Sequence, residues 1–144
     1  MRAGAFLGVL SVVVLSVFVL VSGAQANLEA VYAVDNLFTA VNSGELDAAS
    51  AMFSADAVAS YAVTDQWYEG SDEIGIFLEG LHGEDRAYEI VQIAMTGDTV
   101  DLTLDVADHG HVWGQLKLTS VVHDGRIEHL EVVETRLMLW RVSG

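Results

Sequence analysis

After the first 26 residues, which are mostly apolar, the apolar residues in the first half of the remaining chain follow helical spacing. Between positions 27 and 42 they recur every three or four residues, which predicts an amphipathic helix. Gly44 comes next, in the position that glycine commonly occupies after a helix. Leu46, Ala49 and Phe53 repeat the same spacing, so a short second helix is expected to follow.

A third helix carries the clearest signals. Its apolar positions lie at i, i+3, i+4 and i+7 and would form one buried stripe: Ile74, Phe77, Leu78 and Leu81. Ser71 suits the N-cap, the acidic residues at 72 and 73 suit the positive end of the helix, and Gly83 ends it. Two short strands, 58–63 and 66–69, are expected before this helix.

The second half alternates apolar and polar residues and predicts an antiparallel meander. Glycine-containing turns separate four expected strands: 88–95, 99–107, 111–122 and 126–139. In the second of these, Asp101, Thr103 and Asp105 share a face that is expected to contact solvent. A β-bulge that inverted the alternation would instead turn these carboxylates inward. Helices followed by such a meander predict an α+β fold, in which three N-terminal helices cover a curved antiparallel sheet.

The first 26 residues differ from the rest and resemble an export leader. Arg2 precedes an apolar run that extends to Val21, and the small residues Ala24 and Ala26 form a cleavage pattern. We therefore expect a signal peptide at 1–26 and one domain at 27–144. The apolar run of about 19 residues is also near the length of a membrane span, so an uncleaved anchor is the alternative. In both cases the domain is expected to be exported, to the periplasm or the cell exterior, and only a retained leader would attach it to a membrane.

Composition excludes several classes of protein. Six basic and 21 acidic residues give a net charge of -15, which argues against a nucleic-acid partner, because nucleic acids require a basic surface. The absence of cysteine excludes a disulfide scaffold, a thiolate zinc site and a cysteine nucleophile. His109 and His111 are two residues apart, but His109 falls in a predicted turn, so we expect no metal site.

The last hairpin brings polar residues onto an apolar face. A three-residue turn at 123–125 pairs Val122 with Arg126. The resulting core face contains Leu116, Leu118, Val122, Leu130 and Val132, together with Ser120, Glu128 and Glu134. A two-residue turn would shift the pairing and place Ser120 beside His129 and Glu131 instead.

Carboxyl groups on such a face are candidate acid–base catalysts, because burial raises their pKa. Glu128 and Glu134 are the candidates, with Tyr61 as a partner. The alternative is that both are rim residues near the strand ends, with Arg136 paired to Glu134.

Three segments and their order resemble the SnoaL-like group of the nuclear transport factor 2-like superfamily. The segments are AVNSGELDAASAMFSADAV (40–58), YEGSDEIGIFLEGL (68–81) and HDGRIEHLEV (123–132). The group includes ketosteroid isomerase and limonene-epoxide hydrolase. The resemblance implies a cone-shaped sheet closed by helices, an apolar pocket in its mouth, and a homodimer.

The same resemblance implies which residues line the pocket. The aromatic residues at its mouth would be Tyr61, Trp67 and Tyr68. The remaining lining would come from the last hairpin, through Leu116, Leu118, Ser120, Leu130 and Val132. The family's catalysts are not retained: the isomerase base falls at Tyr61 and the hydrolase's last-strand aspartate at Val132.

Three hypotheses for function follow. The first is an exported domain that binds a small apolar or amphipathic molecule in the cone. The second is an acid–base enzyme, a hydratase, isomerase or hydrolase that acts without a cofactor through pocket carboxylates. The third is a module for dimerisation or assembly. Whether the chain is an enzyme is left open by the sequence.

Overall fold

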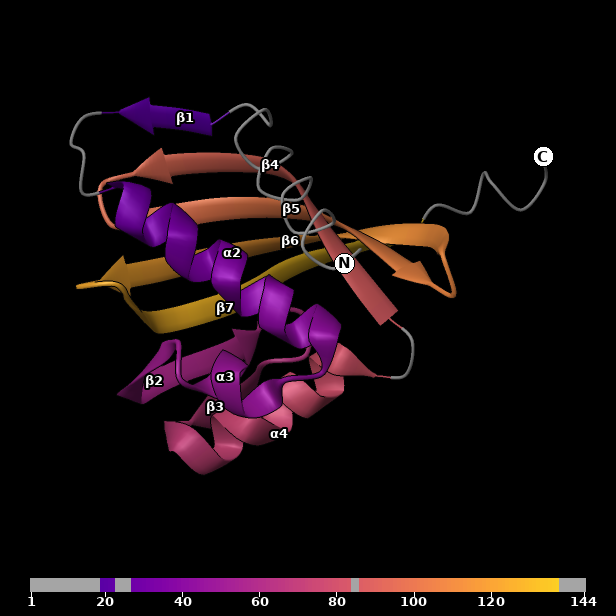
Figure 1. The fold of residues 1–144 in the computed structure, drawn as a ribbon, viewed down its shortest axis with the longest axis horizontal. Helices are drawn as coiled ribbons and strands as arrows, with labels where there is room; N and C mark the ends of the chain where they lie inside the picture. The colour runs from indigo at the N-terminus through magenta and orange to yellow at the C-terminus, as the bar shows by residue number, and fades with distance from the viewer. Residues whose placement is uncertain (1–18, 23–26, 84–85, 138–144) are drawn as a thin grey trace, which may run out of the picture.

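The computed structural model describes residues 19–22, 27–83 and 86–137, which fold as helices packed on one face of a single sheet (Figure 1). The helices are α2 (Asn27–Ser43), α3 (Leu46–Ser50) and α4 (Gly70–His82). The strands are β1 (Val19–Ser22), β2 (Phe53–Tyr61), β3 (Gln66–Glu69), β4 (Arg86–Thr96), β5 (Thr99–Asp108), β6 (His111–His123) and β7 (Arg126–Leu137). Their order in the sheet is β1-β4-β5-β6-β7-β2-β3.

The first predicted helix is confirmed, with a narrower buried face than its apolar residues suggest. Its buried positions in α2 include Val31, Val34, Phe38 and Val41. Leu28 and Tyr32 belong to the same apolar set but are exposed. The burial of one stripe against the sheet is what stabilises this helix, because most helical stability in proteins comes from the packing of an apolar face.

The second and third helices differ from the predictions at their ends. The second helix, α3, has only five residues, and Phe53 begins β2 rather than extending the helix. The four predicted apolar positions of α4 are all buried. Its N-cap is Glu69 and not the predicted Ser71; the Glu69 backbone N–H donates to Glu73 Oε1 at 2.8 Å. This hydrogen bond gives a partner to a backbone N–H at the start of α4, where N–H groups have no partner within the helix.

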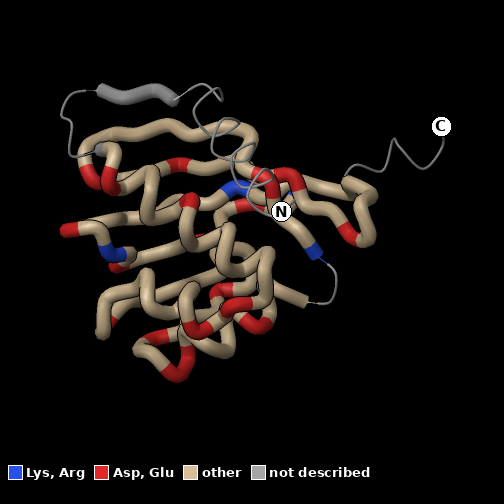
Figure 2. The backbone as a smooth tube through the Cα atoms, viewed as in Figure 1, with Lys and Arg blue, Asp and Glu red and all other residues tan. Residues whose placement is uncertain are grey.

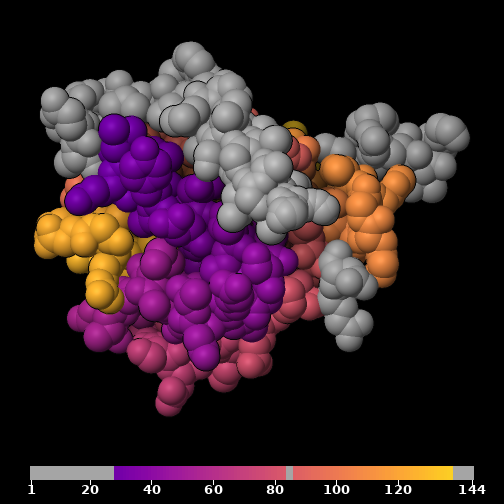
Figure 3. Space-filling model, in the orientation of Figure 1, coloured from indigo at the N-terminus to yellow at the C-terminus, as the bar shows by residue number. Residues whose placement is uncertain are grey.

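The four predicted meander strands form β4 to β7, paired antiparallel in sequence order. β7 then pairs with β2 in parallel, and β3 completes the edge beside β2. α4 packs on β2 and β3, and α2 crosses β4, β6 and β7. In the space-filling view α2 covers the centre of this face, while the β5–β6 and β6–β7 hairpins emerge at opposite ends (Figure 3). The predicted α+β architecture, a curved sheet covered by three helices, is therefore confirmed.

The side of β5 that faces away from the helices carries Asp101 and Asp105, as predicted. Val100, Leu102, Leu104 and Val106 are buried on the inner face. On the outer face, Thr119 Oγ1 donates to Asp101 at 2.8 Å and Gln115 Nε2 donates to Asp105 at 2.9 Å. Acidic positions recur around the rest of the described surface, where basic positions are few (Figure 2).

Part of the expected leader contributes to the sheet. Residues Val19–Ser22 form β1, which pairs in parallel with the Ile93–Thr96 part of β4. The rest of the expected leader, 1–18 and 23–26, lies outside the described residues. Within the part of the chain that the structure describes, no helix has the length and apolarity needed to cross a membrane.

Candidate functional site

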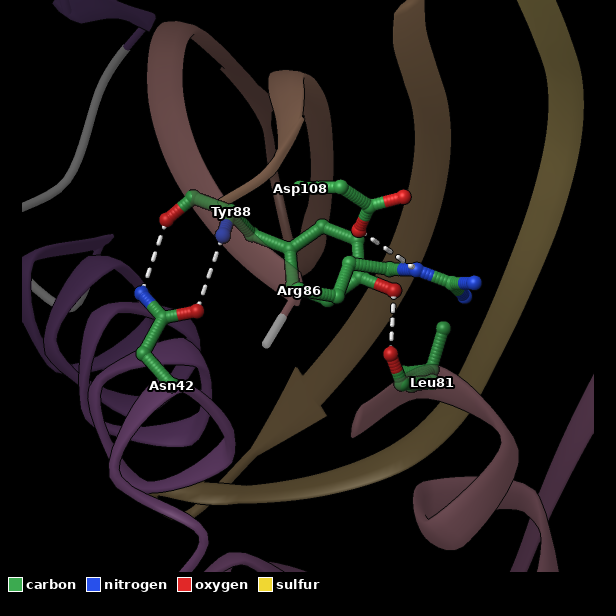
Figure 4. Close-up of polar contacts among 5 residues, drawn as sticks. All are labelled: Asn42, Leu81, Arg86, Tyr88 and Asp108. Carbon is green, nitrogen blue, oxygen red and sulfur yellow. Dashed lines mark hydrogen bonds and ion pairs between the residues drawn. The ribbon is translucent and has the colours of Figure 1, made fainter. Parts of the chain in front are cut away.

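Polar side chains gather where α2 and α4 end and β4 begins. We call Asn42, Tyr61, Arg86, Tyr88 and Asp108 the Tyr88 cluster; Figure 4 shows four of them with Leu81. Asn42 joins the end of α2 to the backbone of β4, because its Nδ2 donates to the Tyr88 carbonyl and its Oδ1 accepts from the Tyr88 N–H, both at 2.8 Å. This paired contact fixes the position of the first residues of β4.

Tyr88 is the buried member of the cluster. Its ring packs against Phe38 with centroids 5.7 Å apart, and its hydroxyl donates to the carbonyl of Leu81 at the end of α4. Burial raises the pKa of Tyr88, and the nearby charge of Arg86 opposes that shift in part. The hydroxyl is therefore a protonated, fixed donor at neutral pH.

Arg86 and Asp108 form an ion pair at the edge of this buried region. Their Cα atoms are partners across β4 and β5, and Arg86 Nε lies 3.6 Å from Asp108 Oδ1. The two side chains are 34% and 39% exposed. The Tyr88 hydroxyl and, to a smaller extent, the charge of Asp108 raise the pKa of Arg86. The guanidinium group also lies against Gly83, just past the negative end of α4, since a Cβ on Gly83 would be 3.2 Å from Arg86 Cζ.

Within the cluster, Tyr61 also belongs to a group of three aromatic rings, together with Tyr68 and Phe77. The centroid of Phe77 lies 5.4 Å from that of Tyr61 and 5.5 Å from that of Tyr68, and the two tyrosine rings are 6.3 Å apart. Burial raises the pKa of Tyr61 to about 12, with smaller contributions from Tyr88 and Tyr68. Tyr61 is thus a hydrogen-bond donor at neutral pH and cannot act as a general base there.

The sequence matches the SnoaL-like domain family over residues 34–134, which takes in β4 to β6, most of β7 and all members of the Tyr88 cluster. The chain belongs to the SnoaL-like domain family. A comparison with curated proteins finds no match.

Solved structures share the fold of this SnoaL-like domain. A candidate polyketide cyclase from Sinorhizobium meliloti is 24% identical, with 70% of this chain and 93% of that one covered and a TM-score of 0.60. An LEH-like epoxide hydrolase from M. tuberculosis is 19% identical, with 78% and 85% covered and a TM-score of 0.57. An NTF-2 like protein of unknown function from Burkholderia xenovorans LB400 is 15% identical, with 83% and 95% covered and a TM-score of 0.65. At these identities the likeness establishes the fold alone.

The hairpin residues predicted to line a pocket do occupy the inner face of this SnoaL-like domain. They are buried in its core: Leu116, Leu118, Ser120, Leu130 and Val132. Ser120 is satisfied there, because its Oγ donates to the His129 carbonyl at 3.1 Å. Their contact with a ligand stays a prediction, since all of them pack among other core side chains.

The predicted pairing of the last hairpin is wrong. His123 pairs with Arg126 across a two-residue turn, in which Asp124 and Gly125 have φ values of 53° and 74°. These values are typical of a type I′ turn, whose twist matches that of a hairpin. The pairing at the turn follows the two-residue alternative, and Glu128 then forms a β-bulge, because Ile127 and His129 oppose consecutive residues of β6.

Both candidate carboxylates consequently leave the inner face. Glu128 is half exposed in its bulge, with Oε2 at 3.7 Å from His123 Nδ1. A second bulge at Val133 pairs Glu134 with Lys117 on the outer face. The alternative pairing of Glu134 with Arg136 is present, with Arg136 Nη2 donating to Glu134 Oε2 at 3.2 Å.

The aromatic residues predicted for the mouth separate onto two faces. Tyr61 and Tyr68 face Phe77 of α4, and so lie on the inner side. Trp67 alternates with Tyr68 and lies on the outer side, where its ring stacks with that of His129. Its predicted position in the mouth is therefore wrong.

Four residues of the cluster were not predicted as site residues: Asn42, Arg86, Tyr88 and Asp108. Arg86 and Tyr88 are two residues apart, which places their side chains on one face of a strand. That spacing was a usable signal, but the predicted strand began at position 88 and left Arg86 in a loop. No group of three or more potential metal ligands occurs among the described residues.

Proposed function

We propose that this SnoaL-like domain is exported and binds a small amphipathic molecule at the Tyr88 cluster. The supporting observation is the Arg86–Asp108 pair, which is about one-third exposed at the margin of an otherwise apolar core. Tyr61 is half-buried, its ring packs against those of Tyr68 and Phe77, and it lies near enough to Arg86 for the guanidinium charge to lower its pKa slightly. Polar donors beside aromatic rings are the usual combination in sites for small molecules.

The charges of the cluster favour a neutral polar group on the ligand. Asp108 balances the charge of Arg86, so the pair supplies N–H donors without a net positive charge. The chain as a whole carries a charge of -15, which repels anions. A carbonyl or hydroxyl oxygen facing Arg86 and Tyr61, attached to an apolar ring system against the partly exposed ring of Tyr68, would satisfy both groups of residues.

We do not extend this proposal to acid–base catalysis by Glu128 or Glu134. Both lie outside the inner face, and Tyr61 remains protonated at neutral pH because burial raises its pKa to about 12. The three groups are therefore not arranged as a general acid and a general base around one substrate.

Equilibrium dialysis with two matched probes tests the proposal. The probes are 2-acetylnaphthalene, which carries a carbonyl oxygen, and 2-ethylnaphthalene, which does not. We expect the ketone to bind about fivefold more tightly, as one net hydrogen bond of about 1 kcal/mol would give. Arg86→Met should abolish this preference while retaining the binding of the hydrocarbon.

The matched control is Arg126→Met, which removes an exposed arginine from the start of β7. It should keep the preference for the ketone. Absence of binding by both probes, or an unchanged preference in Arg86→Met, would contradict the proposal.

Export is tested separately, and so is the homodimer that the family resemblance implies, which we add to the proposal. N-terminal sequencing of protein from secreted, periplasmic and membrane fractions should show a chain that begins at Asn27 outside the cytoplasm.

A homodimer should appear as a doubled mass in light scattering across a range of concentrations. A constant monomer mass would remove the homodimer.

A further inference from the structure

A second arrangement of polar and aromatic groups lies on the outer face of the sheet, away from the Tyr88 cluster. Ser60 of β2 pairs with Trp67 of β3 on one side and with Glu131 of β7 on the other. Val58, two residues earlier on β2, pairs with His129. Residues paired across strands share a face, so Trp67, Ser60, His129 and Glu131 lie together on the outer surface.

Trp67 is exposed but held in place. The residue as a whole is 60% exposed to solvent. Its Nε1–H donates to Asp65 Oδ1 at 3.2 Å, and its ring is stacked with that of His129, with centroids 6.4 Å apart and planes 13° from parallel. An exposed indole fixed by two neighbours presents an aromatic surface without losing further conformational entropy on binding.

Buried polar atoms accompany this aromatic surface. Ser60 is only 2% exposed, and its Oγ has no hydrogen-bond partner among the described residues. His129 Nε2 is also buried and without a partner in that part of the chain. Buried hydroxyl and imidazole groups are nearly always hydrogen-bonded in folded proteins, so this pair indicates that a water or a ligand group completes the hydrogen bonding beside the indole.

The surrounding charges indicate which ligand suits it. Asp65 holds the indole, and Glu131 lies beside Ser60. The β6 residues paired with this part of β7 are neutral: Thr119 opposes Glu131 and Val121 opposes His129. A cation over the indole face would interact with the negative face of its π-system and with these carboxylates.

We propose that Trp67, Ser60, His129 and Glu131 form a binding site for a small organic cation with an alkylated ammonium group. The alkyl groups would contact the indole ring, and the positive charge would face the carboxylates of Asp65 and Glu131. The site is independent of the function proposed for the Tyr88 cluster, and either can fail without the other.

Choline and its uncharged carbon isostere, 3,3-dimethylbutan-1-ol, provide the test. Both are titrated into the complete chain while the Trp67 indole N–H resonance is followed by NMR, with sodium chloride added to equalise ionic strength. We expect a saturable shift with choline and a much smaller response to the isostere. Equal responses to the two, or no saturable shift with choline, would overturn the proposal.

Variants locate the site. Trp67→Leu keeps an apolar side chain and removes the aromatic face, and should weaken choline binding by roughly two- to fivefold, measured by calorimetry. Glu131→Gln should weaken it to a similar extent, whereas Glu134→Gln, a matched change elsewhere on the outer face of β7, should leave it unchanged. Unchanged binding in both Trp67→Leu and Glu131→Gln would overturn the proposal, and Glu131→Gln serves alone if Trp67→Leu does not fold.

Discussion

Asn42→Ala should destabilise the domain far more than the loss of one polar side chain normally does. The amide of Asn42 makes two hydrogen bonds of 2.8 Å to the backbone of Tyr88, which lies 46 residues away in the chain. No other described side chain is positioned to replace it. Removal would therefore leave both an N–H and a carbonyl of β4 without partners at the junction with α2.

The expected magnitude follows from these two bonds. A net intramolecular hydrogen bond contributes roughly 0.5–1.5 kcal/mol, and a buried group left unpaired costs about 1–3 kcal/mol. Because Asn42 is half-buried, water can reach part of the Tyr88 backbone after the substitution. The free energy of unfolding should therefore fall by about 2–3 kcal/mol. For a domain of this size that corresponds to a fall in Tm of about 10 °C.

Chemical denaturation followed by circular dichroism measures the change in the free energy of unfolding. Asn36→Ala is the matched control, because Asn36 lies on the same helix with an exposed side chain. It should be neutral or stabilising by a few tenths of a kcal/mol, roughly the difference in helix propensity. Hydrogen exchange should also become faster at the Tyr88 amide in Asn42→Ala alone. Equal stabilities of the two variants would refute the reasoning.

Four further predictions concern titration and packing. Burial raises the pKa of Tyr61 from 10.0 to about 12, so the folded state binds more protons than the unfolded state in that range; stability should fall as the pH rises through it, and Tyr61→Phe should remove that part of the fall in alkaline denaturation curves. Burial also raises the pKa of Asp35 above 3.8, so ionisation at neutral pH is unfavourable in the folded state; Asp35→Asn should raise the unfolding midpoint at pH 7, and a gain that persists well below pH 3.8 would contradict this cause. A Cβ on Gly114 would lie 2.7 Å from the Arg136 carbonyl oxygen, so Gly114→Ala should cost about 1–3 kcal/mol. A Cβ on Gly80, which lies in α4, would meet nothing within 4 Å, so Gly80→Ala should stabilise the domain by up to about 1 kcal/mol. Thermal melts of the two glycine variants measure both changes.

The helices and strands were predictable because their signals are local. The stripe of Ile74, Phe77, Leu78 and Leu81 depends only on spacing within one helix, and all four residues are buried as expected. Alternation in β5 likewise placed Asp101 and Asp105 on the outer face. In both segments the hydrophobic period alone decides which side faces the core.

The site was less predictable because it depends on contacts between distant segments. Nothing in the sequence near Asn42 or Tyr88 shows that these residues will meet. The positions of Glu128 and Glu134 depended on the turn, and the turn depended on whether Asp124 would adopt a positive φ, which aspartate does only occasionally. That angle set the pairing at the turn, and the bulges at Glu128 and Val133 then decided the side on which each candidate carboxylate lies.

The two bulges in β7 affect any attempt to align this chain with its relatives. Each adds one residue to the strand, so inward-facing positions change from odd to even numbers after Glu128 and back to odd after Val133. An alignment without gaps across β7 would exchange inner and outer positions for at least part of the strand whenever a relative lacks one of the bulges. Transfer of a functional residue from a homologue to β7 therefore requires the strand pairing of both proteins, and sequence order alone would assign the wrong side chain.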